Sequence, residues 1–351
     1  MASTKLVTTF ILLSTLLFIA GCAPQTSSIG WMGPLSGDAA SYGESIQQGV
    51  MLAQEQAGSQ RNIIYEDSQC SGQEAASAMT KLATVDRVQA VIGEVCSGAT
   101  LAAAPIAQNN EVVMISAAST SPELTNNAWV FRTVPSDALQ GAFGAELVYE
   151  DGYEALAILH GNEEYGVGFR DVLEEEFRGE ITATEAFTPG ATDLRTQLTR
   201  IQASGAQAIF IISNSPDTAV AALQQIQELG LQVAVYGSEG LQSSDVLQGA
   251  GAAAQGLIVS SVSQGNEEFI QAHQEAYGSE PGPFAAQAYD AYTALEEALS
   301  TGASTGAEIR EALLEVSFQG VSGPISFDEN GDVQGVYEVS IVEEGAFQTR
   351  E

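Results

Sequence analysis

Short apolar runs alternate with segments of helical periodicity along most of this chain, and this alternation restricts its fold more than any other feature. A run that is apolar throughout, rather than at every second position, predicts a strand buried on both faces of a sheet. Nine such strands are expected, at residues 29–32, 62–65, 90–92, 112–115, 155–159, 181–186, 208–212, 233–236 and 257–260. Helices between buried strands are typical of parallel pairing, so we predict an α/β fold.

The chain is long enough for two lobes. Its 351 residues, 45% of them apolar, suffice for two hydrophobic cores. Nine strands are more than we expect in a single sheet of a chain of this length. We therefore expect two doubly wound lobes joined by crossing strands, because no low-complexity linker separates them. Helices are expected at residues 43–57, 72–85, 101–108, 137–149, 167–177, 194–201, 219–229, 267–277, 283–299 and 307–316. A closing hairpin is expected at 336–348.

The charge balance excludes one class of partner. Asp and Glu total 45 against 11 Lys and Arg, which gives a formal net charge of −34. A surface this acidic repels a phosphate backbone, so we expect no nucleic-acid binding. The same composition stays soluble where salt screens self-repulsion, and we take it as a hypothesis of a halophilic source.

The N-terminus resembles an export signal. Lys5 precedes an apolar run at 6–20, which is shorter than the roughly 20 residues of a membrane span. The run ends in Ile19-Ala20-Gly21-Cys22, which is similar to the lipobox of bacterial lipoproteins. We expect residues 1–21 to be a lipoprotein signal peptide and residues 22–28 a tether, with a lipid on Cys22 as the membrane anchor in the periplasm or at the cell surface. An ordinary secretory signal with a chance cysteine is the alternative.

Export makes the two remaining cysteines informative. Cys70 and Cys96 form an even pair in an oxidising compartment, where a disulfide is the default expectation. A free thiol pair or a metal site is the alternative, although no His or further Cys lies nearby to complete a metal shell. We expect no metal and no cofactor.

Small hydroxylated residues follow successive predicted strands. In open α/β sheets a ligand binds beyond the carboxyl ends of the strands. Ser97 and Gly98 follow the third strand, and Ser97 is placed to cap a helix that runs from Ala99. A hydroxyl, free N–H groups and the positive end of a helix suit a carboxylate. Ser119 and Thr120 follow the fourth strand. Each cluster alone is typical of a cap or turn, but their coincidence favours a ligand site.

A set of motifs resembles one family. The motifs are Gly33-Pro34-Leu35-Ser36-Gly37 with Tyr42-Gly43, Asp67 through Cys70, Ile92-Gly93 with Cys96-Ser97, Ser119 through Thr125, Tyr165-Gly166 and Gly237-Ser238-Glu239-Gly240. In this order they resemble the branched-chain amino acid (Leu/Ile/Val) binding proteins, substrate-binding components of ABC importers with the type I periplasmic-binding fold. The resemblance extends from residue 29 to about residue 345.

The resemblance implies roles for particular residues. It implies that the disulfide joins Cys70 to Cys96, in agreement with the compartment argument. The ligand's carboxylate would be held by Ser97 and by the hydroxyl loop at Ser119 and Thr120. Its ammonium would be held by Glu239, which suits a zwitterion because each charge that leaves water needs a partner. In a chain this acidic, a plain surface carboxylate is the alternative for Glu239.

Selectivity for the ligand's side chain would fall to Tyr42, Tyr165 and Phe284, since aromatic walls suit an aliphatic group. Phe284 is alternatively a core residue. Asn214 stands where family members place a tyrosine that touches the ligand, and this departure admits a more polar amino acid or an amide. We expect an N-terminal lobe of residues 29–135 and 263–328 and a C-terminal lobe of 136–262 and 329–351.

The function we expect is that of an extracytoplasmic substrate-binding lipoprotein. It would capture an amino acid, of the branched-chain or aliphatic class, between its lobes by hinge closure and deliver it to the permease subunits of an ABC importer. A ligand-sensing domain for an amide or other small molecule is one alternative. An enzyme is another, since His160 ends a strand and could line the cleft. No Ser or Cys elbow lies near a helix start, so we expect no enzyme.

Overall fold

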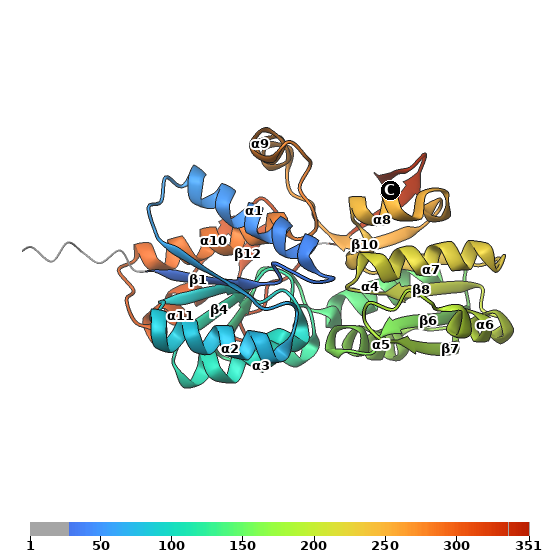
Figure 1. The fold of residues 1–351 in the computed structure, drawn as a ribbon, viewed down its shortest axis with the longest axis horizontal. Helices are drawn as coiled ribbons and strands as arrows, with labels where there is room; N and C mark the ends of the chain where they lie inside the picture. Colours follow the sequence, from blue (N-terminus) through green and yellow to red (C-terminus); the bar gives the residue numbers. More distant parts are fainter. Residues whose placement is uncertain (1–27, 336, 351) are drawn as a thin grey trace, which may run out of the picture.

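The computed structural model describes residues 28–335 and 337–350. Two α/β units lie side by side along the long axis of the molecule (Figure 1). The predicted signal peptide, Cys22 and all of the tether except Ser28 lie outside the described residues. None of the helices in the described part combines the length and apolar character that a bilayer crossing requires.

The first unit is built on a sheet of five parallel strands in the order β2-β1-β3-β4-β5. Its strands are β1 (Ile29–Gly33), β2 (Ile63–Asp67), β3 (Ala90–Gly93), β4 (Val113–Ser116) and β5 (Val130–Arg132). All except β2 are buried along their whole length, as continuous apolar runs predict. Helices cover both faces, which makes the unit doubly wound. They are α2 (Gly72–Lys81) and α3 (Ser97–Asn109) on one face, and α1 (Ala40–Gln56), α10 (Ala285–Ser300) and α11 (Gly306–Leu314) on the other.

The second unit repeats this arrangement. Its seven-stranded sheet has the order β14-β13-β10-β9-β8-β6-β7, and the five strands from β10 to β7 are parallel. The strands are β6 (Ala155–Gly161), β7 (Glu180–Phe187), β8 (Ala208–Ile212), β9 (Ala234–Gly237), β10 (Ile258–Val262), β13 (Tyr337–Glu343) and β14 (Ala346–Thr349). The last two form an antiparallel hairpin on the β10 edge. Helices again cover both faces, namely α4 (Asp137–Glu150) and α5 (Glu164–Glu176) on one, and α6 (Arg195–Ser204), α7 (Pro216–Glu228) and α8 (Ser244–Ala250) on the other.

The chain passes between the two units three times. The first passage follows β5, and the second follows β10 and leads to α9 (Glu267–Tyr277) and α10. A small antiparallel pair, β11 (Ser317–Gln319) and β12 (Pro324–Ser326), precedes the third. Phe327 and Val333 close an isolated bridge and belong to the first core, so the turn between them lies with the first unit, just beyond the boundary expected at 328. We propose that the two units are the two lobes expected from the sequence, and we name them the first and second lobe.

The predicted α/β fold class is confirmed, and all nine predicted strands are present. Short elements escaped prediction, among them the three-residue strands β11 and β12. Strand β5 has three residues and helix α8 has seven, fewer than periodicity needs to be recognised.

Candidate functional site

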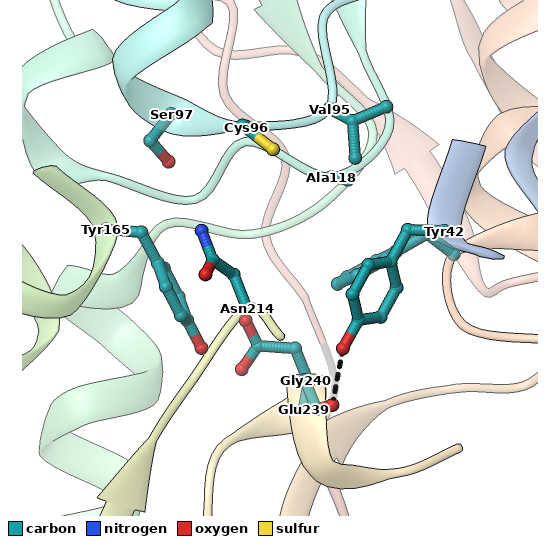
Figure 2. Close-up of a pocket in the computed structure, with 10 residues that line it drawn as sticks. Tyr42, Val95, Cys96, Ser97, Ala118, Tyr165, Asn214, Glu239 and Gly240 are labelled. Carbon is teal, nitrogen blue, oxygen red and sulfur yellow. Dashed lines mark hydrogen bonds between the residues drawn. The ribbon is translucent and has the colours of Figure 1, made fainter. Parts of the chain in front are cut away.

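A small cavity lies between the lobes, with a volume of about 40 Å³. A site for one water needs roughly 10–15 Å³, so the cavity has room for a small solute only. The first lobe lines it with Tyr42, Val95, Cys96, Ser97, Ala118 and Phe284, and the second lobe with Tyr165, Asn214, Glu239 and Gly240. Figure 2 shows these side chains converging from the two lobes.

The strand order explains why these residues meet. Both sheets follow the same order, β2-β1-β3-β4-β5 in the first lobe and β7-β6-β8-β9-β10 in the second. In such sheets the ligand lies beyond the carboxyl ends of the strands, at the point where the strand order reverses. Tyr42 and Tyr165 follow the first strand of each lobe, and Ser97 and Asn214 follow the third. The cavity therefore lies where the two switch points face each other.

Glu239 is buried, not a surface carboxylate. It follows β9 in a short 3₁₀ turn and is only 4% exposed. The Gln140 side-chain nitrogen donates a hydrogen bond of 2.5 Å to Glu239 Oε2 and another of 2.9 Å to the Ser260 carbonyl. Burial raises the pKa of Glu239 above its ordinary value. A cation in the cavity would favour its ionised form.

A second buried carboxyl lies behind this site. Asp137, the first residue of α4, is fully buried, and its Oδ2 accepts a hydrogen bond of 2.8 Å from the Thr120 hydroxyl. Burial and then the charge of Glu239 raise the pKa of Asp137 well above its ordinary value. None of the residues lining the cavity is Lys or Arg, and the positive charge that acts on Asp137 is that of Arg132.

Ser97 faces the cavity from the first lobe. It is the first residue of α3, which begins two residues earlier than expected, and Cys96 rather than Ser97 holds the cap position. The prediction that Ser97 caps a helix from Ala99 was therefore wrong. Its hydroxyl instead accepts a hydrogen bond of 3.2 Å from the Ser121 backbone N–H. The position still combines a hydroxyl with the positive end of a helix.

Three predicted site residues lie outside the cavity lining. The Ser119 hydroxyl is hydrogen-bonded to the Thr100 hydroxyl at 2.6 Å and to two backbone carbonyls, and the Thr120 hydroxyl is used by Asp137. Gly98 instead makes room for the second lobe, because a Cβ on it would lie 2.2 Å from Glu164 Oε2. These three residues contact the elements around the cavity and do not themselves line it.

Arg132 holds the hydroxyl loop and was not predicted. It is fully buried, and its guanidinium donates hydrogen bonds to the Thr120 and Ser121 carbonyls at 3.0 and 2.9 Å. It also pairs with Asp332 at 2.6 Å, near the third passage between the lobes. The strand that ends in Arg132 was not predicted, so its position gave no indication of this role. The rarity of Arg in this chain was the one signal that could have drawn attention to the residue.

The aromatic residues form the walls. The Tyr42 and Phe284 rings lie 6.4 Å apart between centroids, and Phe284 belongs to the first core as well as to the cavity wall. Phe284 is thus a core residue that also lines the cavity, and its role in selectivity stays a prediction. The Tyr165 side chain is buried, and its hydroxyl points towards Glu239 (Figure 2). Sequence reasoning missed the contributions of Val95 and Ala118, small apolar residues in the loops after β3 and β4.

A disulfide joins Cys70 to Cys96, with 5.4 Å between their Cα atoms. It ties the loop after β2 to the residue that immediately precedes Ser97. His160, the candidate of the enzyme alternative, is buried and does not line the cavity. Burial lowers its pKa, and its ring is hydrogen-bonded to the Gly161 carbonyl at 2.8 Å.

Comparison with known proteins agrees with this geometry. The chain is 28% identical over 334 residues to the leucine-, isoleucine-, valine-, threonine-, and alanine-binding protein of Pseudomonas aeruginosa, covering 89% of this chain and 88% of that protein. It is 26% identical over 322 residues to the Leu/Ile/Val-binding protein of Escherichia coli K12, covering 87% of each.

Solved structures give the same result. The leucine binding protein LivK of Thermotoga maritima has a TM-score of 0.88 at 27% identity, covering 93% of this chain and 98% of that one. LivJ of Streptococcus pneumoniae, solved with isoleucine, has a TM-score of 0.85 at 28% identity, covering 93% and 100%. A Rhodopseudomonas palustris solute binding protein solved with benzoate shares the fold, with a TM-score of 0.85 at 20% identity over 92% and 94%.

The resemblance drawn from the motifs is confirmed. Residues 26–345 match the family model described as periplasmic binding protein. Since members of that family bind solutes without transforming them, the expectation of a binding protein rather than an enzyme agrees with this match. The chain belongs to the periplasmic binding protein family.

Proposed function

We propose that this protein captures an α-amino acid between its two lobes and delivers it to the permease of an ABC importer. The observation that carries the proposal is the buried carboxylate of Glu239 in a cavity that Ser97, at the start of α3, lines from the opposite lobe. A zwitterion matches this arrangement, because its ammonium pairs with Glu239 while its carboxylate lies at the positive end of the helix.

The remaining walls suit a short side chain. Val95, Ala118 and Phe284 supply apolar surface, and the Pseudomonas aeruginosa relative is named for binding leucine, isoleucine, valine, threonine and alanine. A ligand that carries a carboxylate but no amine would leave Glu239 without a positive partner, and a buried unpaired charge is costly. A small α-amino acid is therefore the ligand class we propose.

Binding and lobe closure are proposed to be coupled. The ligand binds first to the lobe that carries Ser97, and closure then brings Glu239 and Tyr165 onto it. The contact of Gly98 with Glu164 and the loop at Ser119 and Thr120 support the closed arrangement from behind. The permease would recognise the closed form.

We propose that the N-terminus anchors the protein outside the cytoplasm. Cleavage after residue 21 would leave Cys22 to carry the lipid, with residues 22–28 as the tether. A sensing role would use the same cavity. Neighbouring genes for a permease and an ATPase would support transport, whereas a neighbouring kinase would support sensing.

The experiment is a thermal-shift panel of amino acids, benzoate and urea on the wild type and on Glu239→Gln. Amino acids should raise the melting temperature of the wild type, and the isosteric amide should remove most of that rise. Glu44→Gln, an exposed position on α1, is the matched control and should behave as wild type. Stabilisation by benzoate or urea that survives in Glu239→Gln would overturn the proposal.

A further inference from the structure

Asn214 places a carboxamide in the cavity that neither end of an amino acid requires. It follows β8 and lies between Tyr165 and Glu239 in Figure 2, with its side chain directed into the space between the lobes. No residue of the described chain forms a hydrogen bond with this side chain. Its carboxamide is half-buried, because its other side borders a groove of about 430 Å³ that also lies between the lobes.

The loop around Asn214 is held firmly. The Ser213 hydroxyl donates to the Ser215 carbonyl at 3.1 Å and accepts from the Ser215 N–H at 3.2 Å. The Ser215 side chain in turn caps α7 by accepting from the Thr218 N–H at 3.4 Å. Residue 214 therefore sits in a turn closed on both sides, and binding needs little reordering of its backbone.

We infer that the Asn214 carboxamide binds a polar group on the ligand's side chain, which makes a small amino acid with a side-chain hydroxyl or carboxamide the preferred ligand class. The inference rests on the proposed function, because Glu239 and Ser97 then take the two charged ends. A carboxamide offers two donors and two acceptors, so it pairs with either group. A purely aliphatic side chain in the same place would leave the half-buried carboxamide to the solvent of the adjoining groove, so a polar ligand gains one hydrogen bond that an aliphatic ligand lacks.

One competing role is distinguishable. Asn214 occupies the position in the second lobe that Ser97 occupies in the first, and the competing role is therefore a contact with the ligand's carboxylate. Loss of a carboxylate contact weakens all amino acids by the same factor. Loss of a contact with the ligand's side chain instead changes the ratio of the affinities for threonine and valine. These two amino acids differ only by a hydroxyl in place of a methyl group.

The test is calorimetric titration of threonine, serine and asparagine against valine and alanine. The wild type should bind threonine about tenfold more tightly than valine, the value of one well-made hydrogen bond. Asn214→Leu and Asn214→Ala should bring that ratio to one or below. Asn162→Leu, an exposed carboxamide after β6 that does not line the cavity, should keep the wild-type ratio.

Three results would overturn the inference. They are a wild type that prefers valine, a ratio that both Asn214 variants leave unchanged, and an equal loss for all ligands, which would assign Asn214 to the carboxylate. Binding of no amino acid by the wild type would instead refute the proposed function, and with it this inference. Circular dichroism of each variant shows whether it is folded.

Discussion

The Tyr42 hydroxyl donates a hydrogen bond of 2.7 Å to the Gly240 carbonyl, 198 residues further along the chain and in the opposite lobe. The bond is buried and lies beside Glu239, so it closes one side of the cavity. Burial, followed by the charge of Glu239, raises the pKa of Tyr42, which keeps the phenol protonated and able to donate. The two lobes are thus joined at the ligand site itself.

Tyr42→Phe should loosen this connection. Removing one neutral hydrogen bond is expected to weaken amino acid binding by about three- to tenfold, since such bonds contribute about 0.5–1.5 kcal/mol. Tyr277→Phe is the control, because its hydroxyl donates to the Gln48 carbonyl at 3.1 Å within the first lobe. It should leave affinity unchanged. Equal losses of affinity in both variants would show that the bond between the lobes has no special role.

Ligand affinity should depend on pH through Glu239. Its pKa is raised by burial, and the ammonium of the ligand pairs with the ionised form, so affinity should fall as pH decreases through that raised pKa. The limiting slope is about tenfold for each pH unit, the definition of a single proton linkage. Titrations at several pH values on wild type and Glu239→Gln check this. A pH dependence that persists in the variant would assign the proton to another group.

Stability of the unliganded protein should change with pH in the opposite sense, through Glu94. Its carboxyl is fully buried, accepts hydrogen bonds from Ser68 and from the Cys96 N–H, and burial raises its pKa to about 7. The folded state therefore binds this proton more tightly than the unfolded state does. The stabilisation is complete below the unfolded value of about 4.5 and is lost as pH rises through about 7.

Urea denaturation at pH 5 and pH 7.5 measures the effect. The wild type should be more stable at the lower pH by roughly 1–3 kcal/mol, because each pKa unit corresponds to about 1.4 kcal/mol. The high net negative charge contributes in the same direction, so Glu94→Gln is the needed comparison. This variant should show a smaller gain on acidification, and an identical gain would remove Glu94 from the explanation.

Arg132→Lys should destabilise the hydroxyl loop. The buried guanidinium binds two carbonyls of that loop and Asp332 at once, and a lysine cannot reproduce that forked geometry. We expect a loss of about 1–3 kcal/mol, because lysine keeps the positive charge but leaves at least one buried carbonyl without its hydrogen-bond donor. Arg200→Lys, on an exposed pair with Glu185, should cost less than about 1 kcal/mol in the same denaturation experiment. Similar losses in both variants would contradict this role.

Added salt should stabilise the fold. With a formal net charge of −34, self-repulsion is strong at low ionic strength, and the Debye length falls from about 30 Å at 0.01 M to about 3 Å at 1 M. The melting temperature should rise over that range of NaCl, and the rise should begin at low ionic strength, where screening of the charges changes most. A flat or falling profile would remove the halophilic hypothesis.

The sequence predicted the fold well because its strands are continuous apolar runs. The resemblance to a known family, rather than periodicity, pointed to Tyr42, Glu239 and Asn214, and their positions after β1, β9 and β8 agree with a site beyond the strand ends. The sequence could not place Ser119 and Thr120 outside the cavity. The direction of a loop hydroxyl depends on tertiary contacts, such as the hydrogen bonds that Arg132 donates to the loop backbone. No hydrophobic periodicity or motif in the sequence links the residues that make these contacts.

The repeated strand order has one more consequence. Because the two sheets share one strand order, equivalent loops contribute Tyr42 and Tyr165 after the first strand of each lobe and Ser97 and Asn214 after the third. After the fourth strand the equivalence ends, because Ala118 in the first lobe corresponds to Glu239 in the second. That difference puts a carboxylate on one side of the cleft alone, and so decides which way round an asymmetric molecule must lie.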